Sequence, residues 1–133
     1  MCLEPWWTEH ERQWVTFDTE DALTKLSRED VVHAYHPTTR NLRNLVRNAG
    51  LAWRVLRDYR PDMVISTGAG VAVPFFWMRR LVGAQTVYLE VFDRIDSPTL
   101  TARLCRPVTD LFLVQWPEQQ RLYKGSVLLG QVW

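Results

Sequence analysis

The sequence predicts an open, doubly wound α/β domain built on a parallel sheet. Short β-rich runs alternate with helical patterns along the chain, and this alternation requires the crossover connections of a parallel sheet. Polar residues gather directly after the ends of the strand-like runs, which is where open parallel sheets bind ligands. At 133 residues, the chain is expected to form a single domain, residues 1–133.

Local sequence signals define the first elements. Residues 13–17 (QWVTF) and 31–36 (VVHAYH) are predicted to be strands. Residues 19–26 between them predict a short helix, with Thr19 as its N-cap and acidic residues in its first turn. A long helix is predicted over residues 40–59.

The long helix carries two different faces. Apolar residues recur three and four positions apart and predict one apolar face, made of Leu42, Leu45, Val46, Ala49, Trp53 and Leu56. Four arginines fall within a narrow arc on a second face, namely Arg40, Arg43, Arg47 and Arg54. A basic stripe beside an apolar-aromatic surface suits an anionic membrane or a lipid phosphate, so we expect membrane contact at Arg43, Arg47 and Arg54. A solvated outer face is the alternative.

The second half of the chain continues the alternation. A strand is predicted at residues 62–66, followed by a helix over about 71–81 that Gly83 ends. Ser97 and Pro98 predict the N-cap and first position of a further short helix. The remaining strands are predicted at residues 85–91, 110–115 and 126–130, with a short helix between the last two.

Composition argues against several classes of protein. A net charge of +1 disfavours a nucleic-acid binder driven by gross charge. The longest uncharged stretch, residues 63–78, falls short of the roughly 18 to 20 apolar residues of a membrane span and contains two glycines and a proline. The N-terminal segment is charged and lacks the apolar region of a signal peptide. Cys2 and Cys105 provide neither a metal cluster nor a disulfide framework, which fits a reducing cytosolic location.

The segment STGAG, residues 66–70, is the glycine loop. It is expected between a strand end and a helix start, where its glycines let the backbone approach a ligand closely. Free amides of the helix that begins near Val71 would then bind an anion. The spacing fits neither the dinucleotide fingerprint nor the P-loop, and a tight strand-to-helix turn is the alternative.

The segment EVFDRIDSPT, residues 90–99, is the acidic loop, and it follows the next strand. An acid at Glu90 or Asp93 would orient a sugar hydroxyl or act as a general base. Arg94 would hold a phosphate oxygen. A solvated loop whose charges pair with one another is the alternative. His36 is a further candidate base at a strand end.

Four segments together resemble one bacterial family: HPTTRNLRNL, RPDMVISTGAGVAVPFF, YLEVFDRIDSPTLTARL and DLFLVQWPEQ. The family is the exopolysaccharide-type glycosyltransferase subunit. It is related to the membrane-anchoring subunit of the two-part UDP-N-acetylglucosamine transferase of lipid-linked oligosaccharide synthesis. A more distant likeness is to the N-terminal half of the peptidoglycan lipid-intermediate N-acetylglucosaminyltransferase. The resemblance runs from about Trp6 to Gly130.

The resemblance implies a GT-B glycosyltransferase split over two chains. This chain would be its N-terminal, acceptor-side, Rossmann-like domain, and a partner chain would bind the UDP-sugar. The acceptor would be a polyprenyl-diphosphate-linked sugar at the cytoplasmic face of the cell membrane, with no metal or cofactor required. The matching acceptor- and phosphate-binding positions are Gly68, Ala69, Gly70, Arg94, Thr38, Arg40 and Asn41, and the matching catalytic acids are Glu90 and Asp93.

One departure from the family pattern concerns its opening strand and Gly-Gly-His loop, which this sequence does not show. The strand would be expected in the middle of the sheet, between residues 13–17 and 62–66. A late start codon, a fragment and an inactive relative all remain open. We expect the 133-residue chain alone to be inactive and poorly stable.

Three functional hypotheses follow. The leading one is a transferase subunit that passes N-acetylglucosamine or glucuronic acid from a UDP-sugar to the lipid-linked acceptor. The second is a non-catalytic anchoring module that recruits the donor-binding subunit to the membrane. The third is a nucleotide-binding α/β domain of unrelated role.

Overall fold

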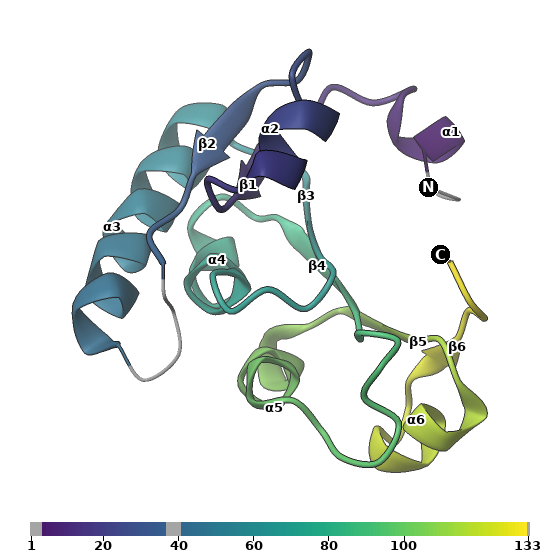
Figure 1. The fold of residues 1–133 in the computed structure, drawn as a ribbon. Coiled ribbons are helices and arrows are strands. Elements are labelled where there is room, and N and C mark those ends of the chain that lie inside the picture. The colour runs from purple at the N-terminus through teal and green to yellow at the C-terminus, as the bar shows by residue number, and fades with distance from the viewer. Residues whose placement is uncertain (1–3, 37–40, 133) are drawn as a thin grey trace.

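The computed structural model describes residues 4–36 and 41–132 of the chain (Figure 1). Helices and strands alternate along it, as the sequence predicts. In order, they are α1 (Glu4–Trp7), β1 (Trp14–Thr16), α2 (Glu20–Lys25), β2 (Val31–His33), α3 (Leu42–Tyr59), β3 (Met63–Ser66), α4 (Ala72–Met78), the 3₁₀ turn η1 (Arg79–Leu81), β4 (Gln85–Leu89), α5 (Leu100–Cys105), the 3₁₀ turn η2 (Arg106–Val108), β5 (Leu111–Val114), α6 (Pro117–Leu122) and β6 (Val127–Leu128).

All paired strands are parallel, but they form two sheets rather than one. β1 pairs with β2, and the four-stranded sheet has the order β3-β4-β5-β6. Within the described residues, no strand pairing joins β1 to β3. The gap between the two sheets lies between β1 and β3. These are the two strands that the sequence predicts on either side of an absent central strand.

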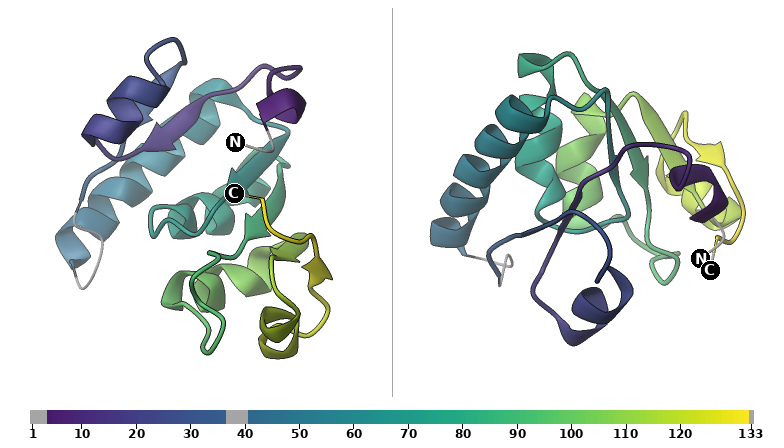
Figure 2. Two further views of the ribbon diagram at one scale, coloured as in Figure 1. Left: turned by 45° about the vertical axis from the view of Figure 1, so that its right-hand side comes forward. Right: turned by 90° about the horizontal axis from the view of Figure 1, so that it is seen from above.

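The helices α3, α4 and α5 form one layer against the four-stranded sheet (Figure 2). Its buried core contains side chains from all three helices and from the inner face of the strands. Aromatic rings occupy the centre of this core. Tyr88 stacks on Phe112 with ring centroids 5.0 Å apart, and the ring centroids of Phe112 and Tyr123 lie 4.6 Å apart. This aromatic cluster fixes β4 and β5 side by side, directly below the loops that follow them.

The orientation of α3 differs from the sequence prediction. Leu42 and Val46, assigned to the apolar face, are 78% and 72% exposed. Leu56 is buried as predicted, but the rest of the buried face consists of Asn44, Asn48, Leu51 and Ala52, which were not assigned to it. Asn48 explains this, because its side chain accepts a hydrogen bond from the amide of Tyr35 at 2.8 Å and donates to the carbonyl of the same residue at 2.9 Å. These bonds tie α3 to the end of β2 and turn the Asn48 side of the helix inward.

Helix ends follow the sequence signals with one exception. The hydroxyl of Thr19 accepts a hydrogen bond from the amide of Ala22, as an N-cap does, and Gly83 has a φ of +70° beyond the end of η1. The predicted N-cap of α5 at Ser97 is wrong by two residues. Thr99 is the cap, and its hydroxyl also binds a buried carboxylate described below.

Candidate functional site

The carboxyl ends of β3, β4 and β5 meet at one edge of the sheet. Parallel pairing places Ser66 opposite Tyr88 and Leu89 opposite Leu113, so the glycine loop and the acidic loop leave the sheet side by side. An open cleft of about 320 Å³ lies there. It is lined by Thr67, Leu89, Glu90, Val91, Phe92, Asp93 and Gln115. The structure therefore brings the two predicted loops together at the rim where open parallel sheets bind ligands.

Gly68 allows the glycine loop to pass close to the acidic loop. Its φ is +105°, and a Cβ atom placed on it would lie 2.5 Å from Cγ1 of Val91. Its amide donates to the hydroxyl of Ser66 at 3.2 Å, which closes the turn at the end of β3. Only glycine meets both requirements, because any other residue is strained at this φ and collides with Val91.

The next residues of the glycine loop present backbone donors. The carbonyls of Ala69 and Gly70 accept the first hydrogen bonds of α4, from the amides of Ala72 and Val73. Within residues 4–36 and 41–132, the amides of Ala69, Gly70 and Val71 make no hydrogen bond. Backbone amides without a partner at the start of a helix can donate hydrogen bonds to an anion.

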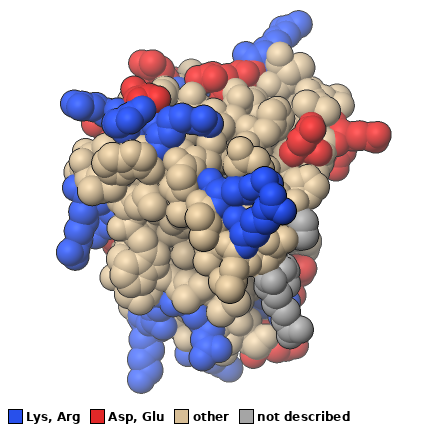
Figure 3. All heavy atoms as spheres, turned by 90° about the vertical axis from the view of Figure 1, so that its left-hand side faces the viewer, with Lys and Arg blue, Asp and Glu red and all other residues tan. Residues whose placement is uncertain are grey.

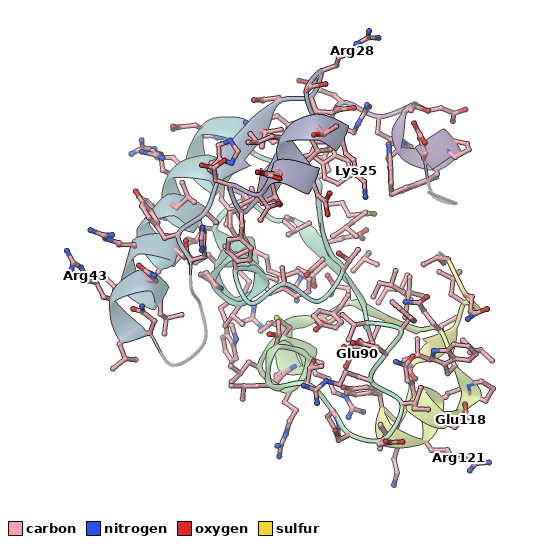
Figure 4. The ribbon with its side chains drawn as sticks, in the orientation of Figure 1. Lys25, Arg28, Arg43, Glu90, Glu118 and Arg121 are labelled. Carbon is pink, nitrogen blue, oxygen red and sulfur yellow. The ribbon has the colours of Figure 1, made fainter. Side chains whose placement is uncertain are left out.

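Glu90 is completely buried beneath the cleft, between the start of α5 and the end of α6 (Figure 4). Its carboxylate accepts hydrogen bonds from the hydroxyl of Tyr123, from Thr99 Oγ1 at 3.3 Å to each oxygen, and from the amide of Val91 at 3.0 Å. Burial and the carboxylate of Glu90 raise the pKa of Tyr123. The phenol therefore stays protonated and donates to Glu90, and the carboxylate holds the base of the acidic loop in place.

Asp93 and Arg94 lie further along the acidic loop, and both side chains are exposed. Asp93 also lines the cleft, so its carboxylate is accessible to a ligand there. The two predicted acids thus occupy different environments, one enclosed by donors and one open to solvent. Their catalytic roles stay predictions.

The remaining predicted phosphate ligands belong to the segment before α3. Thr38 and Arg40 lie outside the described residues. The side chain of Asn41 accepts a hydrogen bond from the amide of Asn44 at 3.0 Å and caps α3. Asn41 is therefore committed to the helix end through its side-chain oxygen.

Arg43, Arg47 and Arg54 are exposed along α3. The guanidinium of Arg47 lies 5.2 Å from the centre of the Tyr35 ring. Figure 3 shows this side of the molecule, where Lys and Arg side chains are spread over a surface of mostly uncharged residues, with Asp and Glu toward its upper and right-hand edges. The exposed apolar residues of the helix, Leu42 and Val46, contribute to that surface.

Sequence reasoning missed the polar residues that support the loops from inside. Thr99 and Tyr123 bind Glu90, and the buried side chain of Gln119 binds the backbone of the acidic loop. Their partners are distant in the sequence, so no local pattern indicates these contacts. The hydroxyl of buried Tyr88, near Gly68, lacks a hydrogen-bond partner within the described residues.

Within residues 4–36 and 41–132, no group of His, Cys, Asp or Glu side chains has the arrangement of a metal site. Over those same residues, every helix is too short or too polar to cross a membrane.

The model of the family described as "Oligosaccharide biosynthesis protein Alg14 like" matches residues 16–132. The chain belongs to this family. The match confirms the resemblance predicted from the four sequence segments.

Curated relatives agree with the family. The chain is 34% identical over 101 residues to the UDP-N-acetylglucosamine transferase subunit ALG14 of Eremothecium gossypii, covering 67% of this chain and 45% of the relative. It is 33% identical over 79 residues to the mouse subunit of the same name, covering 55% of this chain and 36% of the relative. The chain thus spans less than half the length of these relatives.

A solved structure shows where this fold belongs. Acinetobacter baumannii MurG superposes with a TM-score of 0.71 at 15% sequence identity, covering 96% of this chain and 38% of MurG. MurG has the GT-B fold, so the chain has the fold of one part of such an enzyme, as predicted. The likeness extends to sequence in one MurG-type relative. The UDP-N-acetylglucosamine–N-acetylmuramyl-(pentapeptide) pyrophosphoryl-undecaprenol N-acetylglucosamine transferase of Alkaliphilus metalliredigens is 27% identical over 87 residues, covering 65% of this chain and 23% of that enzyme.

Proposed function

We propose that this chain is the acceptor-binding subunit of a two-chain glycosyltransferase. The complex would transfer N-acetylglucosamine or a related sugar from a UDP-sugar to a polyprenyl-diphosphate-linked acceptor. The names of the relatives as UDP-N-acetylglucosamine transferase subunits support a partner chain that binds the donor. The observation that carries the proposal is the meeting of the glycine loop and the acidic loop in one cleft, in a chain of this family.

The glycine loop is suited to the acceptor diphosphate. The amides of Ala69, Gly70 and Val71 have no partner within the described residues, and in this proposal they donate to the phosphate oxygens. The exposed guanidinium of Arg94 adds a positive charge from the opposite loop. In this arrangement the diphosphate lies at the rim, and the acceptor sugar extends into the cleft toward Asp93.

The acidic loop supplies the chemistry in this proposal. The acceptor hydroxyl attacks the anomeric carbon of the donor sugar, the bond to UDP breaks, and a carboxylate takes the hydroxyl proton. Asp93 is the accessible acid. Glu90 contributes by fixing the amide of Val91 and the hydroxyl of Thr99, because its carboxylate already accepts their hydrogen bonds. UDP departs with its charge stabilised by donors of the partner chain, without a metal ion.

Membrane contact would occur through α3. Its exposed apolar residues Leu42, Val46 and Trp53 adjoin the stripe formed by Arg43, Arg47 and Arg54. Apolar and basic side chains side by side on one helix suit the interface of an anionic lipid layer. The chain would then sit peripherally on the cytoplasmic face of the membrane, where a lipid-linked acceptor reaches the cleft.

A non-catalytic anchoring subunit is the second candidate. The enclosure of Glu90 by three donor groups favours it, because a carboxylate engaged in this way does not reach a substrate hydroxyl. In that case the partner chain provides every reacting group, and this chain contributes acceptor binding and membrane contact.

Transfer by the complex separates these candidates. The chain would be produced with its donor-binding partner and supplied with labelled UDP-N-acetylglucosamine and a polyprenyl-diphosphate-linked sugar. We expect Asp93→Asn to lower the initial rate about 100-fold or more, as loss of a general base does. Asp96→Asn changes another exposed acid of the same loop and should keep the wild-type rate. If transfer persists in both Asp93→Asn and Glu90→Gln, the chain is an anchor rather than a catalyst.

A further inference from the structure

Gln119 lies where the acidic loop meets the first turn of α6, and its side chain is completely buried. Its Oε1 accepts hydrogen bonds from the backbone amides of Gln115 at 2.9 Å and Trp116 at 3.3 Å. Its Nε2 donates to the backbone carbonyls of Val91 at 2.6 Å and Arg94 at 3.1 Å. Both donors and both acceptor positions of the carboxamide are therefore occupied.

These bonds hold the turn that carries Asp93 at both of its ends. The carbonyl of Phe92, inside the same turn, accepts a hydrogen bond from Trp116 Nε1 at 2.7 Å. Three backbone carbonyls of the turn thus bind α6 and its N-cap, while the side chains of Phe92, Asp93 and Arg94 are exposed. The hydrogen bonds from α6 and its N-cap to the backbone of the turn therefore set the direction of the Asp93 and Arg94 side chains.

The chemistry of the contact requires a carboxamide at residue 119. A glutamate would place a second oxygen against the carbonyls of Val91 and Arg94, which have no proton to share. A methionine has a similar length but would leave two amides and two carbonyls without a partner. The residue at this position therefore controls the geometry of a loop that lies more than twenty residues earlier in the sequence.

We propose that Gln119 is a positioning residue for sugar transfer, holding Asp93 and Arg94 opposite the glycine loop without touching the substrate. The proposal rests on the function proposed above for the cleft. The positioned groups act on a reacting hydroxyl and a phosphate, so their placement matters far more to turnover than to folding.

The first test measures transfer by the complex with Gln119→Met. Gln120→Met is the matched control, because it makes the same change at the neighbouring, exposed glutamine. We expect Gln119→Met to lower kcat about tenfold or more, since misplacing a catalytic group by about 1 Å costs up to roughly 100-fold in rate. The KM for the UDP-sugar stays unchanged, because the donor binds the partner chain. Gln120→Met keeps the wild-type kcat.

The second test measures amide hydrogen exchange in the free chain. Residues 91–97 should exchange faster in Gln119→Met and keep the wild-type rate in Gln120→Met, with β3 and β4 unchanged in both. Gln119→Glu keeps the size of the side chain and removes both donors to Val91 and Arg94, so it tests the same contact if Gln119→Met does not fold.

The outcomes distinguish this proposal from the one it rests on. Wild-type exchange over residues 91–97 in Gln119→Met, or in Gln119→Glu if the first variant does not fold, overturns the positioning role. Faster exchange together with an unchanged kcat also overturns it. A wild-type complex that transfers no sugar overturns the proposed function instead, and the exchange experiment then still decides whether Gln119 holds the loop.

Discussion

At the scale of single residues, Gly68 shows how closely the two loops of the cleft depend on each other. Its positive φ and its contact with Val91 are both incompatible with a side chain. Gly68→Ala should lower the free energy of unfolding by about 1–3 kcal/mol, through backbone strain and overpacking. Gly50→Ala is the control, because a Cβ there meets nothing within 4 Å inside α3. Urea unfolding should show the control stabilised by about 0.5–1 kcal/mol.

Buried phenols make the stability of the chain sensitive to alkaline pH. Burial raises the pKa of Tyr88 and Tyr123 above the ordinary value of 10.0, and neighbouring Glu90 adds to the effect. A raised pKa means that the unfolded chain loses these protons first, so the contribution of the two phenols to stability is complete below pH 10 and is lost as the pH rises above it. Urea unfolding at several pH values should show this decline.

The same measurement on Tyr123→Phe provides the control for the pH effect. This variant removes one of the titrating groups, so its stability should depend less steeply on pH above 10. An equal slope in the wild type and the variant would show that Tyr123 does not titrate differently on folding. The buried thiol of Cys105, whose pKa is raised to about 12, contributes to the decline in both proteins.

At the scale of elements, α3 shows what periodicity does and does not determine. The spacing of apolar residues correctly predicts a helix and its approximate length. It does not decide which side faces the core, because the helix has an apolar stripe around Leu42 and Val46 and further apolar residues at Leu51 and Ala52. The paired hydrogen bonds of Asn48 with Tyr35 select the side of Leu51 and Ala52, and they depend on a residue that follows β2.

The exposed stripe of α3 leads to a prediction about lipid binding. Arg43→Glu combined with Arg47→Glu should abolish sedimentation of the chain with vesicles that contain anionic lipid, because each basic residue near such a surface contributes about 1 kcal/mol. Arg121→Glu is the control, since Arg121 lies in α6 on the other side of the molecule from Arg43 (Figure 4). Equal loss of binding in the control would point to general charge attraction rather than to α3.

Some loops and helix caps are determined by residues close in the sequence, and others by residues on distant elements. The Thr19 cap, the Gly83 stop and the glycine loop after β3 depend on residues close in sequence, and the sequence predicts them correctly. The α5 cap at Thr99 depends on Glu90 and Tyr123, which lie on other elements. The hydrogen bond of Gln119 to the acidic loop likewise joins residues far apart in the sequence, so no local pattern predicts it.

At the scale of the whole molecule, the order of strands decides where function lies. Alternating strands and helices predict a parallel sheet, and the paired strands are all parallel. The carboxyl ends of the parallel strands share one edge of the sheet. Loops that follow different strands therefore converge at that edge although they are far apart in the sequence. The division into two sheets is likewise a property of the whole chain, and the family pattern rather than local propensity indicates it.

The central claim is that one rim, formed by the glycine loop and the acidic loop, receives a lipid-linked diphosphate sugar. The most direct measurement is the amide NMR spectrum of the chain, titrated with a short-chain polyprenyl-diphosphate-linked N-acetylglucosamine. We expect the amide signals of Ala69, Gly70 and Val71 to shift together with those of Asp93 and Arg94. Shifts confined to other parts of the chain, or none in either loop at saturating ligand, would contradict this claim.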